Sequence, residues 1–308
     1  MDAKGAGSEV SAGTDLSGLA LVPQRFTVDS ERVDTYLRSI GDEGFASFAA
    51  AVTSREGVRI APLTIFDRYM STYLVGNEAL AGKLPPFGVH AKQTSRFCGE
   101  LLVGHDYELV GGVRDLQVRR NMEYLSVTCN CVDVLEPDKV LIEAVYTRAQ
   151  AFQRQQYGRS EGRVRPSRAD WLAQAGADAS ARFPAEGSVL EGSSRRITQE
   201  RLNLFLGPGP NFHTDPALAR RLGFEGTIAA GVMATELECE LYRELFGMRL
   251  FRAAELDVSY VAPIPEGVDL QPVCVVERSD ADATVLRSAV CTGSGALVTI
   301  SRIRVAAG

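Results

Sequence analysis

Apolar residues recur at helical spacing in two stretches near the start of the chain. The first runs from Ser30 to Ile40, and Ser30 is of a residue type that caps helix N-termini. The second runs from Pro62 to Val75, where the apolar positions are Leu63, Phe66, Tyr69, Met70, Tyr73 and Leu74. The spacing predicts a helix over each stretch.

Strand-like runs follow these helices. They cover Val89–Cys98, Tyr107–Gln117, Glu123–Leu135 and Val140–Phe152. A helix followed by a series of antiparallel strands is typical of an α+β unit in which the helix packs on a curved sheet.

The second half of the chain has the same order of elements. The predicted helices are Thr198–Leu206, Pro216–Leu222 and Ile228–Phe246, and the predicted strands are Glu255–Val261, Val268–Glu277, Thr284–Thr292 and Leu297–Val305. A Gly-x-Asp turn lies at matching places in the halves, because Gly104 and Asp106 align without gaps with Gly267 and Asp269. The same offset aligns Val110 with Val273 and indicates a duplication. A sheet wrapped around a helix, present twice, predicts a double hotdog of class α+β.

Composition divides the chain into four predicted parts. Residues 1–24 are small and polar, which predicts a disordered leader. The N-terminal hotdog is expected over residues 25–153, and the C-terminal hotdog with the candidate site over residues 197–308. Residues 154–196 predict a linker. Its basic run consists of Arg154, Arg159, Arg163, Arg165 and Arg168. The run is either a solvated tether or a phosphate-binding rim for a CoA nucleotide.

The overall composition of the 308 residues narrows the class of protein. The apolar share of 45% and charged share of 23% are typical of a soluble globular protein, and no apolar run is long enough to span a membrane. The net charge of −6 argues against nucleic acid as a partner. Six cysteines without a Cys-x-x-Cys pair predict buried free thiols and a cytoplasmic location. Three scattered histidines give no metal-ligand spacing, and we expect no metal or cofactor.

One segment combines residues suited to proton transfer. It runs from Gly207 to Asp215 and contains His213, whose ordinary pKa suits acid–base chemistry near neutrality. Asn211 could hydrogen-bond a water or an acyl oxygen. Gly231 stands near the start of the last predicted helix, where unpaired backbone N–H groups could bind a developing oxyanion. Asp215 followed by Pro216 predicts a helix cap rather than a catalytic group.

This segment resembles the active-site stretch of MaoC-like hydratases and dehydratases, in which a loop ending in His-x-Asp precedes an Ile-Ala-His-Gly-Met-type helix start. Leu256 to Gly267 is also similar to the family's strand and turn after the hotdog helix. The chain departs from the pattern at Pro208, which stands where the family has its catalytic aspartate, and at Ala230, which stands where the family often has histidine.

The resemblance implies a lyase that interconverts 3-hydroxyacyl and 2-enoyl thioesters of CoA or a carrier protein. His213 would be the sole acid or base, with Gly231 at the thioester oxygen and Asn211 orienting water or substrate. Without the aspartate, elimination or isomerisation is expected rather than fast hydration. Association through the hotdog sheets implies a possible homodimer.

Two other functions stay open at this point. The chain could be a catalytically silent hotdog that binds an acyl thioester or supports a partner, because Pro208 and Ala230 both remove polar family positions. It could also be a hotdog thioesterase, which uses an acidic residue on a central helix. The candidates are Asp67, Glu236, Glu238 and Glu240. We expect Glu236, Glu240 and Glu244 to face solvent, and Asp67 with Arg68 to form either an internal ion pair or a site.

Overall fold

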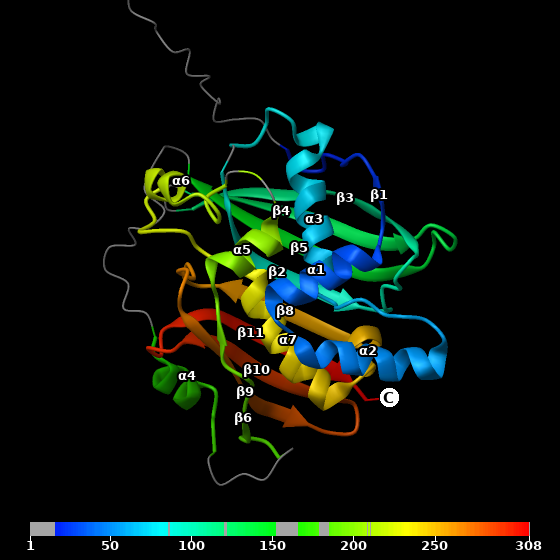
Figure 1. The fold of residues 1–308 in the computed structure, drawn as a ribbon, viewed down its shortest axis with the longest axis vertical. Coiled ribbons are helices and arrows are strands. Elements are labelled where there is room, and N and C mark those ends of the chain that lie inside the picture. The colour runs from blue at the N-terminus through cyan, green and yellow to red at the C-terminus, as the bar shows by residue number, and fades with distance from the viewer. Residues whose placement is uncertain are drawn as a thin grey trace, which may run out of the picture.

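A single antiparallel sheet curves around the central helices of the protein in the computed structural model (Figure 1). The strand order is β1-β3-β4-β5-β2-β8-β11-β10-β9-β6, and β7 pairs with β9. The structure describes residues 16–85, 87–119, 122–151, 166–178, 185–207, 209 and 211–307. The N-terminal half supplies one end of the sheet and the C-terminal half the other, which confirms the predicted double hotdog.

The N-terminal half follows the predicted pattern closely. Its helices are α1 (Ser30–Ile40), α2 (Glu43–Glu56), α3 (Ile65–Gly76) and the short 3-10 helix η1 (Glu78–Leu80), and its strands are β1 (Gln24–Thr27), β2 (Val89–Phe97), β3 (Asp106–Arg119), β4 (Met122–Asp133) and β5 (Val140–Ala151). Asp29, not Ser30, caps α1 by accepting a hydrogen bond from the amide of Arg32. Helix α2 was not predicted, because its alanine-rich sequence has little amphipathic pattern.

The C-terminal half contains the longest helix. Its helices are α4 (Arg168–Gln174), α5 (Gln199–Leu206), α6 (Pro216–Arg221), α7 (Val232–Phe246) and α8 (Arg249–Arg252), and its strands are β6 (Val189–Glu191), β7 (Arg195–Arg196), β8 (Ala254–Tyr260), β9 (Asp269–Ser279), β10 (Ala283–Thr292) and β11 (Leu297–Ala306). The predicted linker is therefore too long, because β6 and β7 pair with β9 and Trp171 of α4 is buried against this sheet.

The predicted disordered leader is also too long. Leu16 and Leu21 are buried in the main core, and Ala20 forms an isolated β-bridge with Gly112. Burial of these two leucines gives the segment an apolar anchor that its polar composition hides.

The two halves meet at the pairing of β2 with β8. Thr94 lies directly opposite Asp257, and its hydroxyl donates to the carboxylate over 3.2 Å. These residues are 163 apart, the same offset that relates Gly104 to Gly267. Both glycines have positive φ, 88° and 83°, just before β3 and β9 begin. The local two-fold relation between the halves therefore passes through the Thr94–Asp257 pair.

Helix α7 is enclosed on almost every side, which overturns the predicted solvent face. Glu236 and Glu238 are only 2% and 0% exposed. Glu240 is half-buried and pairs with Arg195 over 2.8 Å, and only Glu244 is exposed as expected. The sheet packs on one side of α7, and α1 and α2 of the other half lie across it, so most of its side chains are shielded from water (Figure 1).

The prediction of free and mostly buried thiols is confirmed. All six are free, and five of them are buried while Cys98 is half-buried. Burial raises the pKa of the Cys274 thiol to about 12, so that thiol stays protonated and packs as a small apolar group.

A buried ion pair joins the two halves away from the sheet. Both guanidinium Nη atoms of Arg243 on α7 donate to the carboxylate of Asp42, over 2.5 and 2.9 Å. The same carboxylate caps α2 by accepting from the amide of Phe45. The rings of Phe45 and Phe48 also lie 5.2 and 5.7 Å from the guanidinium carbon. Removing Arg243 would leave an uncompensated charge inside the protein.

We expect Arg243→Ala to lower the free energy of unfolding by about 3–5 kcal/mol, because it leaves Asp42 buried and unpaired. Urea denaturation would measure the loss. Arg302→Ala is the matched control, since Arg302 pairs with Glu277 on the exposed surface and its loss should cost less than about 1 kcal/mol. Equal losses in the two variants would contradict the role given to the buried pair.

Candidate active site

The predicted site segment lies between α5 and α6 and is held against the chain that leads into α7. Gln199 of α5 makes the connection. Its amide nitrogen donates to the carbonyl of His213 over 3.1 Å, and its amide oxygen accepts from the hydroxyl of Thr227 over 2.7 Å. Asp215 accepts from the amides of Ala217 and Leu218, which confirms its predicted role as the cap of α6. The loop is therefore fixed from both ends.

The imidazole of His213 has a defined tautomer. Its Nδ1 lies 2.6 Å from the carbonyl oxygen of Ile228. Because a carbonyl oxygen only accepts, Nδ1 carries the hydrogen and Nε2 presents a lone pair. Nε2 has no hydrogen-bond partner among the residues that the structure describes. This arrangement leaves a neutral imidazole with a free basic nitrogen.

Burial lowers the pKa of His213 to about 4, and the positive charge of Arg68 contributes to this shift. The hydrogen bond to the carbonyl of Ile228 raises the pKa of His213, but by less than burial lowers it. The imidazole therefore stays neutral at physiological pH, which is the state a general base requires.

Asn211 has a structural task in the same loop. Its side-chain oxygen accepts from the amide of His213 over 2.9 Å, and its backbone oxygen accepts from the amides of Thr214 and Asp215. This tight turn sets the direction of the histidine. The predicted contact of Asn211 with water stays a prediction, and Pro208 lies outside the described residues.

Gly231 stands at the N-terminus of α7 with backbone that is already helical. A Cβ at this position would come within 2.4 Å of the Tyr260 ring, so close packing alone requires glycine here. No hydrogen bond to its amide occurs within the described part of the chain. The amide points along the positive end of the helix dipole, and Ile228, the partner of His213, is three residues earlier. The helix start and the imidazole are therefore close neighbours.

Two residues of α3 approach this region from the N-terminal half. The guanidinium of Arg68 lies 4.8 Å from the ring centre of Phe205 on α5, and its charge acts on His213. Asp67 turns instead toward β2, where it accepts a hydrogen bond from Gln93 over 2.6 Å. The described structure has no ion pair between Asp67 and Arg68, which removes one of the two predicted alternatives. Both residues can be found in the sequence because they are adjacent charged residues within an otherwise apolar predicted helix.

His90 is a further histidine in this region, and no sequence motif indicates a function for it. Its ring lies between Tyr146 and Tyr260, with centroid distances of 4.2 and 4.3 Å. Burial lowers its pKa to about 3, and its Nε2 is buried without a hydrogen-bond partner. Because Tyr260 also covers Gly231, His90 forms part of the wall behind the candidate site.

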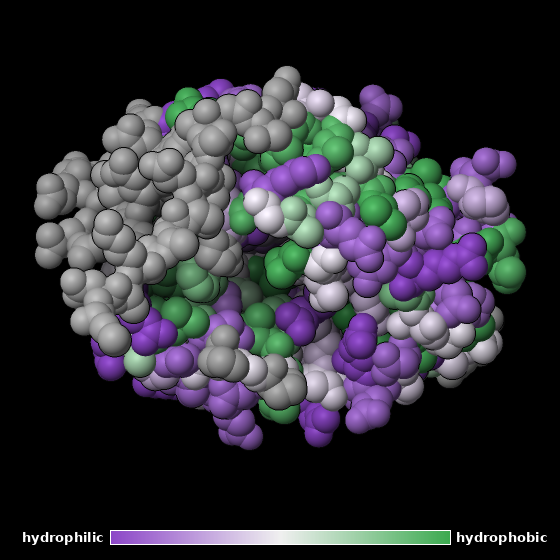
Figure 2. Space-filling view, turned by 90° about the horizontal axis from the view of Figure 1, so that it is seen from above, coloured by the Kyte–Doolittle hydropathy of each residue, from purple (hydrophilic) through white to green (hydrophobic). Residues whose placement is uncertain are grey.

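The surface near this end of the molecule is hollowed. Seen from above, the described residues surround a depression that has hydrophobic residues inside it and both hydrophobic and hydrophilic residues at its edge (Figure 2). Such a depression can accept a ligand with an apolar part.

The predicted phosphate rim cannot be placed. Arg154, Arg159, Arg163 and Arg165 lie outside the described residues. Arg168 forms an ion pair with Glu191. No helix in the described ranges is both long and apolar enough to cross a membrane.

Solved structures with the same fold support the architecture. A MaoC-like dehydratase matches over 94% of this chain and 98% of its own, with a TM-score of 0.73 and 14% identity. A conserved hypothetical protein of Mycobacterium tuberculosis with a double hotdog fold matches over 96% of both chains, with a TM-score of 0.62 and 15% identity. At these identities the likeness shows the fold alone.

The peroxisomal multifunctional enzyme type 2 of Drosophila melanogaster also matches, over 93% of this chain, with a TM-score of 0.66 and 13% identity. This chain spans about half of that enzyme, since 48% of its length is covered. No protein-family model matches the sequence, and no curated protein matches it either.

The effect of the Arg68 charge on the pKa of His213 can be tested by substitution. We expect Arg68→Gln to raise the pKa of His213 from about 4, because it removes a positive charge that disfavours the protonated imidazole. Titration of the histidine ring protons by NMR would measure the shift. The pKa of His90 serves as an internal control, since Arg68 is not among the causes of its depression. An unchanged value for His213 would contradict the proximity of the two side chains.

Proposed function

We propose that the protein is a lyase that interconverts 3-hydroxyacyl and 2-enoyl thioesters. The observation that carries this proposal is the neutral His213, whose Nδ1 is held by the carbonyl of Ile228, three residues before the N-cap of α7. A base and a set of backbone donors next to each other are the two groups that removal of a proton beside a thioester carbonyl requires.

The proposed chemistry begins at the thioester carbonyl. Its oxygen accepts a hydrogen bond from the amide of Gly231, and the helix dipole favours the negative charge that develops there. Nε2 of His213 removes the proton from C2, and the hydroxyl group on C3 leaves. Asn211 serves as a positioning residue, because it holds the backbone of His213.

The substrate class follows from the same groups. An acyl thioester has a C2 proton acidified by its carbonyl, so one neutral imidazole can act as its base. The hollow in Figure 2, with its hydrophobic interior, suits an acyl chain. The carrier is CoA or a protein-bound pantetheine, and a homodimer formed through the sheets remains part of the proposal. The fold-level match to a MaoC-like dehydratase supports this reaction class by analogy.

We expect His213→Ala to lower kcat for dehydration of a 3-hydroxyacyl thioester by about 10²–10⁴-fold, the usual contribution of a positioned base. Ultraviolet absorbance of the conjugated enoyl thioester would follow the reaction, with short- and long-chain esters of both CoA and pantetheine. His105→Ala is the matched control, because His105 lies in the turn before β3 and its expected effect is below threefold.

Three other results would each assign the protein differently. Turnover that survives in His213→Ala would remove the histidine from the mechanism. Binding of acyl thioesters without turnover by the wild type would indicate a silent acyl-binding protein. Release of the free thiol, detected with a thiol reagent, would indicate a thioesterase.

A further inference from the structure

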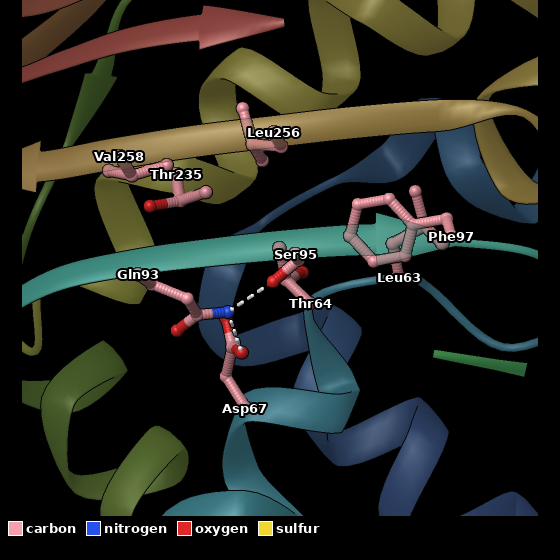
Figure 3. Close-up of a pocket in the computed structure, with 9 residues that line it drawn as sticks. All are labelled: Leu63, Thr64, Asp67, Gln93, Ser95, Phe97, Thr235, Leu256 and Val258. Atoms are coloured by element: carbon pink, nitrogen blue, oxygen red, sulfur yellow. Dashed lines mark hydrogen bonds between the residues drawn. The ribbon is translucent and has the colours of Figure 1, made fainter. Parts of the chain in front are cut away.

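A buried polar cluster lies where the two halves meet (Figure 3). Asp67 comes from the first turn of α3, Gln93 and Ser95 come from β2, and Thr235 comes from α7. These side chains line a cavity of about 10 Å³, which is room for about one water molecule. The other lining residues are Leu63 and Thr64 just before α3, Phe97 of β2, and Leu256 and Val258 of β8.

The hydrogen bonds of this cluster leave two oxygens unused. The amide nitrogen of Gln93 donates to Oδ1 of Asp67 over 2.6 Å and to the hydroxyl of Ser95 over 2.9 Å, which uses both of its hydrogens. Oε1 of Gln93 is buried without a partner, although the residue is only 7% exposed. Oδ2 of Asp67 has no partner among the described residues either. A buried acceptor without a partner lowers the free energy of unfolding by about 1–3 kcal/mol. The cluster is therefore not explained by a contribution to stability.

The cavity is close to the proposed thioester site. Thr235 is one helical turn beyond Gly231, and its amide donates to the carbonyl of that residue over 3.4 Å. One turn of helix spans about 5.4 Å. The hydroxyl of Thr235 is 2.9 Å from that of Tyr260, whose ring covers Gly231. Asp67 therefore shares its cavity with a residue one helical turn from Gly231.

The lyase reaction needs a second group that the site loop lacks. The hydroxyl on C3 is a poor leaving group unless it receives a proton as it departs. The site loop has no proton donor at the position of the family's catalytic aspartate, because Pro208 stands there and has no titratable group. Asp67 is a carboxyl group in the neighbourhood that has no cationic partner in the described structure.

We propose that Asp67 is the residue that donates the proton to the leaving hydroxyl, and that the cavity beside it holds the water that forms. This inference rests on the lyase function proposed above. Nε2 of His213 takes the proton from C2, and that electron pair forms the C2–C3 double bond. The C3–O bond breaks, and the oxygen leaves with the proton of Asp67 as water. The proton on His213 then returns to Asp67 through water, so no other reactant is consumed.

The protonation states of the two groups suit these roles. Burial raises the pKa of Asp67 to about 7, while burial lowers that of His213 to about 4. Between these values the acid keeps its proton and the base stays neutral, and such a separation is how enzymes assign acid and base roles. The titratable groups that face Asp67 from neighbouring elements are Tyr36, Cys129, Tyr146, Cys239 and Tyr260. Burial raises the pKa of each one, so all stay neutral across this range.

The test compares Asp67→Asn with the wild type. Asparagine has the same shape and stays neutral, as the protonated carboxyl is, so we expect an unchanged fold by circular dichroism and melting temperature. The value of kcat for dehydration should fall by about 100-fold or more, with KM changed less than threefold. Glu238→Gln is the matched control and should retain activity. Glu238 is equally buried on α7, but it accepts from Ser301 and Thr299 inside the C-terminal half.

A second measurement separates proton donation from a structural role. Exchange of the C2 proton of a saturated acyl thioester with deuterated water needs only His213 and the thioester site. Asp67→Asn should keep this exchange, and His213→Ala should lose it. The wild-type kcat for dehydration should also fall above about pH 7, where Asp67 loses its proton, and the fall should be absent from the residual activity of Asp67→Asn.

Full dehydration by Asp67→Asn, together with loss of activity in His213→Ala, would overturn the role of Asp67 and leave the lyase function standing. Loss of C2 exchange in both variants would also overturn it, since it would indicate that Asp67 only shapes the site. A wild type that dehydrates no thioester of the panel would overturn the lyase function, and the role of Asp67 with it.

Discussion

The pairing of β2 with β8 is the constraint on which the rest of the structure depends. It joins the two curved half-sheets into one, so the central helices α3 and α7 lie on the same inner side. Each helix then packs against the sheet and against side chains of the other half. The buried Asp42–Arg243 pair and the cavity between α3 and α7 are both consequences of this enclosure. The halves are therefore parts of one core rather than separate domains.

This enclosure also explains the electrostatics of the candidate site. Burial disfavours charge on any group, so it lowers the pKa of a histidine and raises that of a carboxyl. His213 comes from a loop of the C-terminal half and Asp67 from a helix of the N-terminal half. The same dry environment moves their pKa values in opposite directions, to about 7 for Asp67 and about 4 for His213, and both groups are neutral between these values. An acid and a base can thus coexist without forming an ion pair that would disable both.

Much of the fold could be predicted from the sequence because local patterns determine it. The strands β2 to β5 and β8 to β11 and the helix from Ser30 to Ile40 follow from periodicity, and the cap at Asp215 follows from residue type. The short strands β1, β6 and β7 were not predicted, because they have too few residues to show a pattern. The burial of Glu236 could not be predicted, because its position suggested a solvent face that the other half covers.

The candidate site shows the same division between local and long-range information. The position of His213 beside the start of α7 was accessible through a motif within one segment of chain. The sequence predicts Asp67 with Arg68 as an ion pair or a site but does not predict their neighbours. The cavity shared by Asp67 and Thr235 and the contact of Arg68 with Phe205 both arise from packing across the halves.

The Thr94–Asp257 pair has a consequence for ancestry. If two identical single hotdogs met at this seam, the residue on the symmetry axis would face its own copy, and an aspartate there would face an aspartate. Like charges directly opposite each other destabilise a sheet, so such a position would favour a residue compatible with itself. Fusion into one chain removes that restriction. Thr94 donates to Asp257, and Lys92 pairs with the same carboxylate over 2.9 Å. Within one chain the two halves can be chemically unlike, and in the proposed reaction the N-terminal half supplies the acid Asp67 while the C-terminal half supplies the base His213.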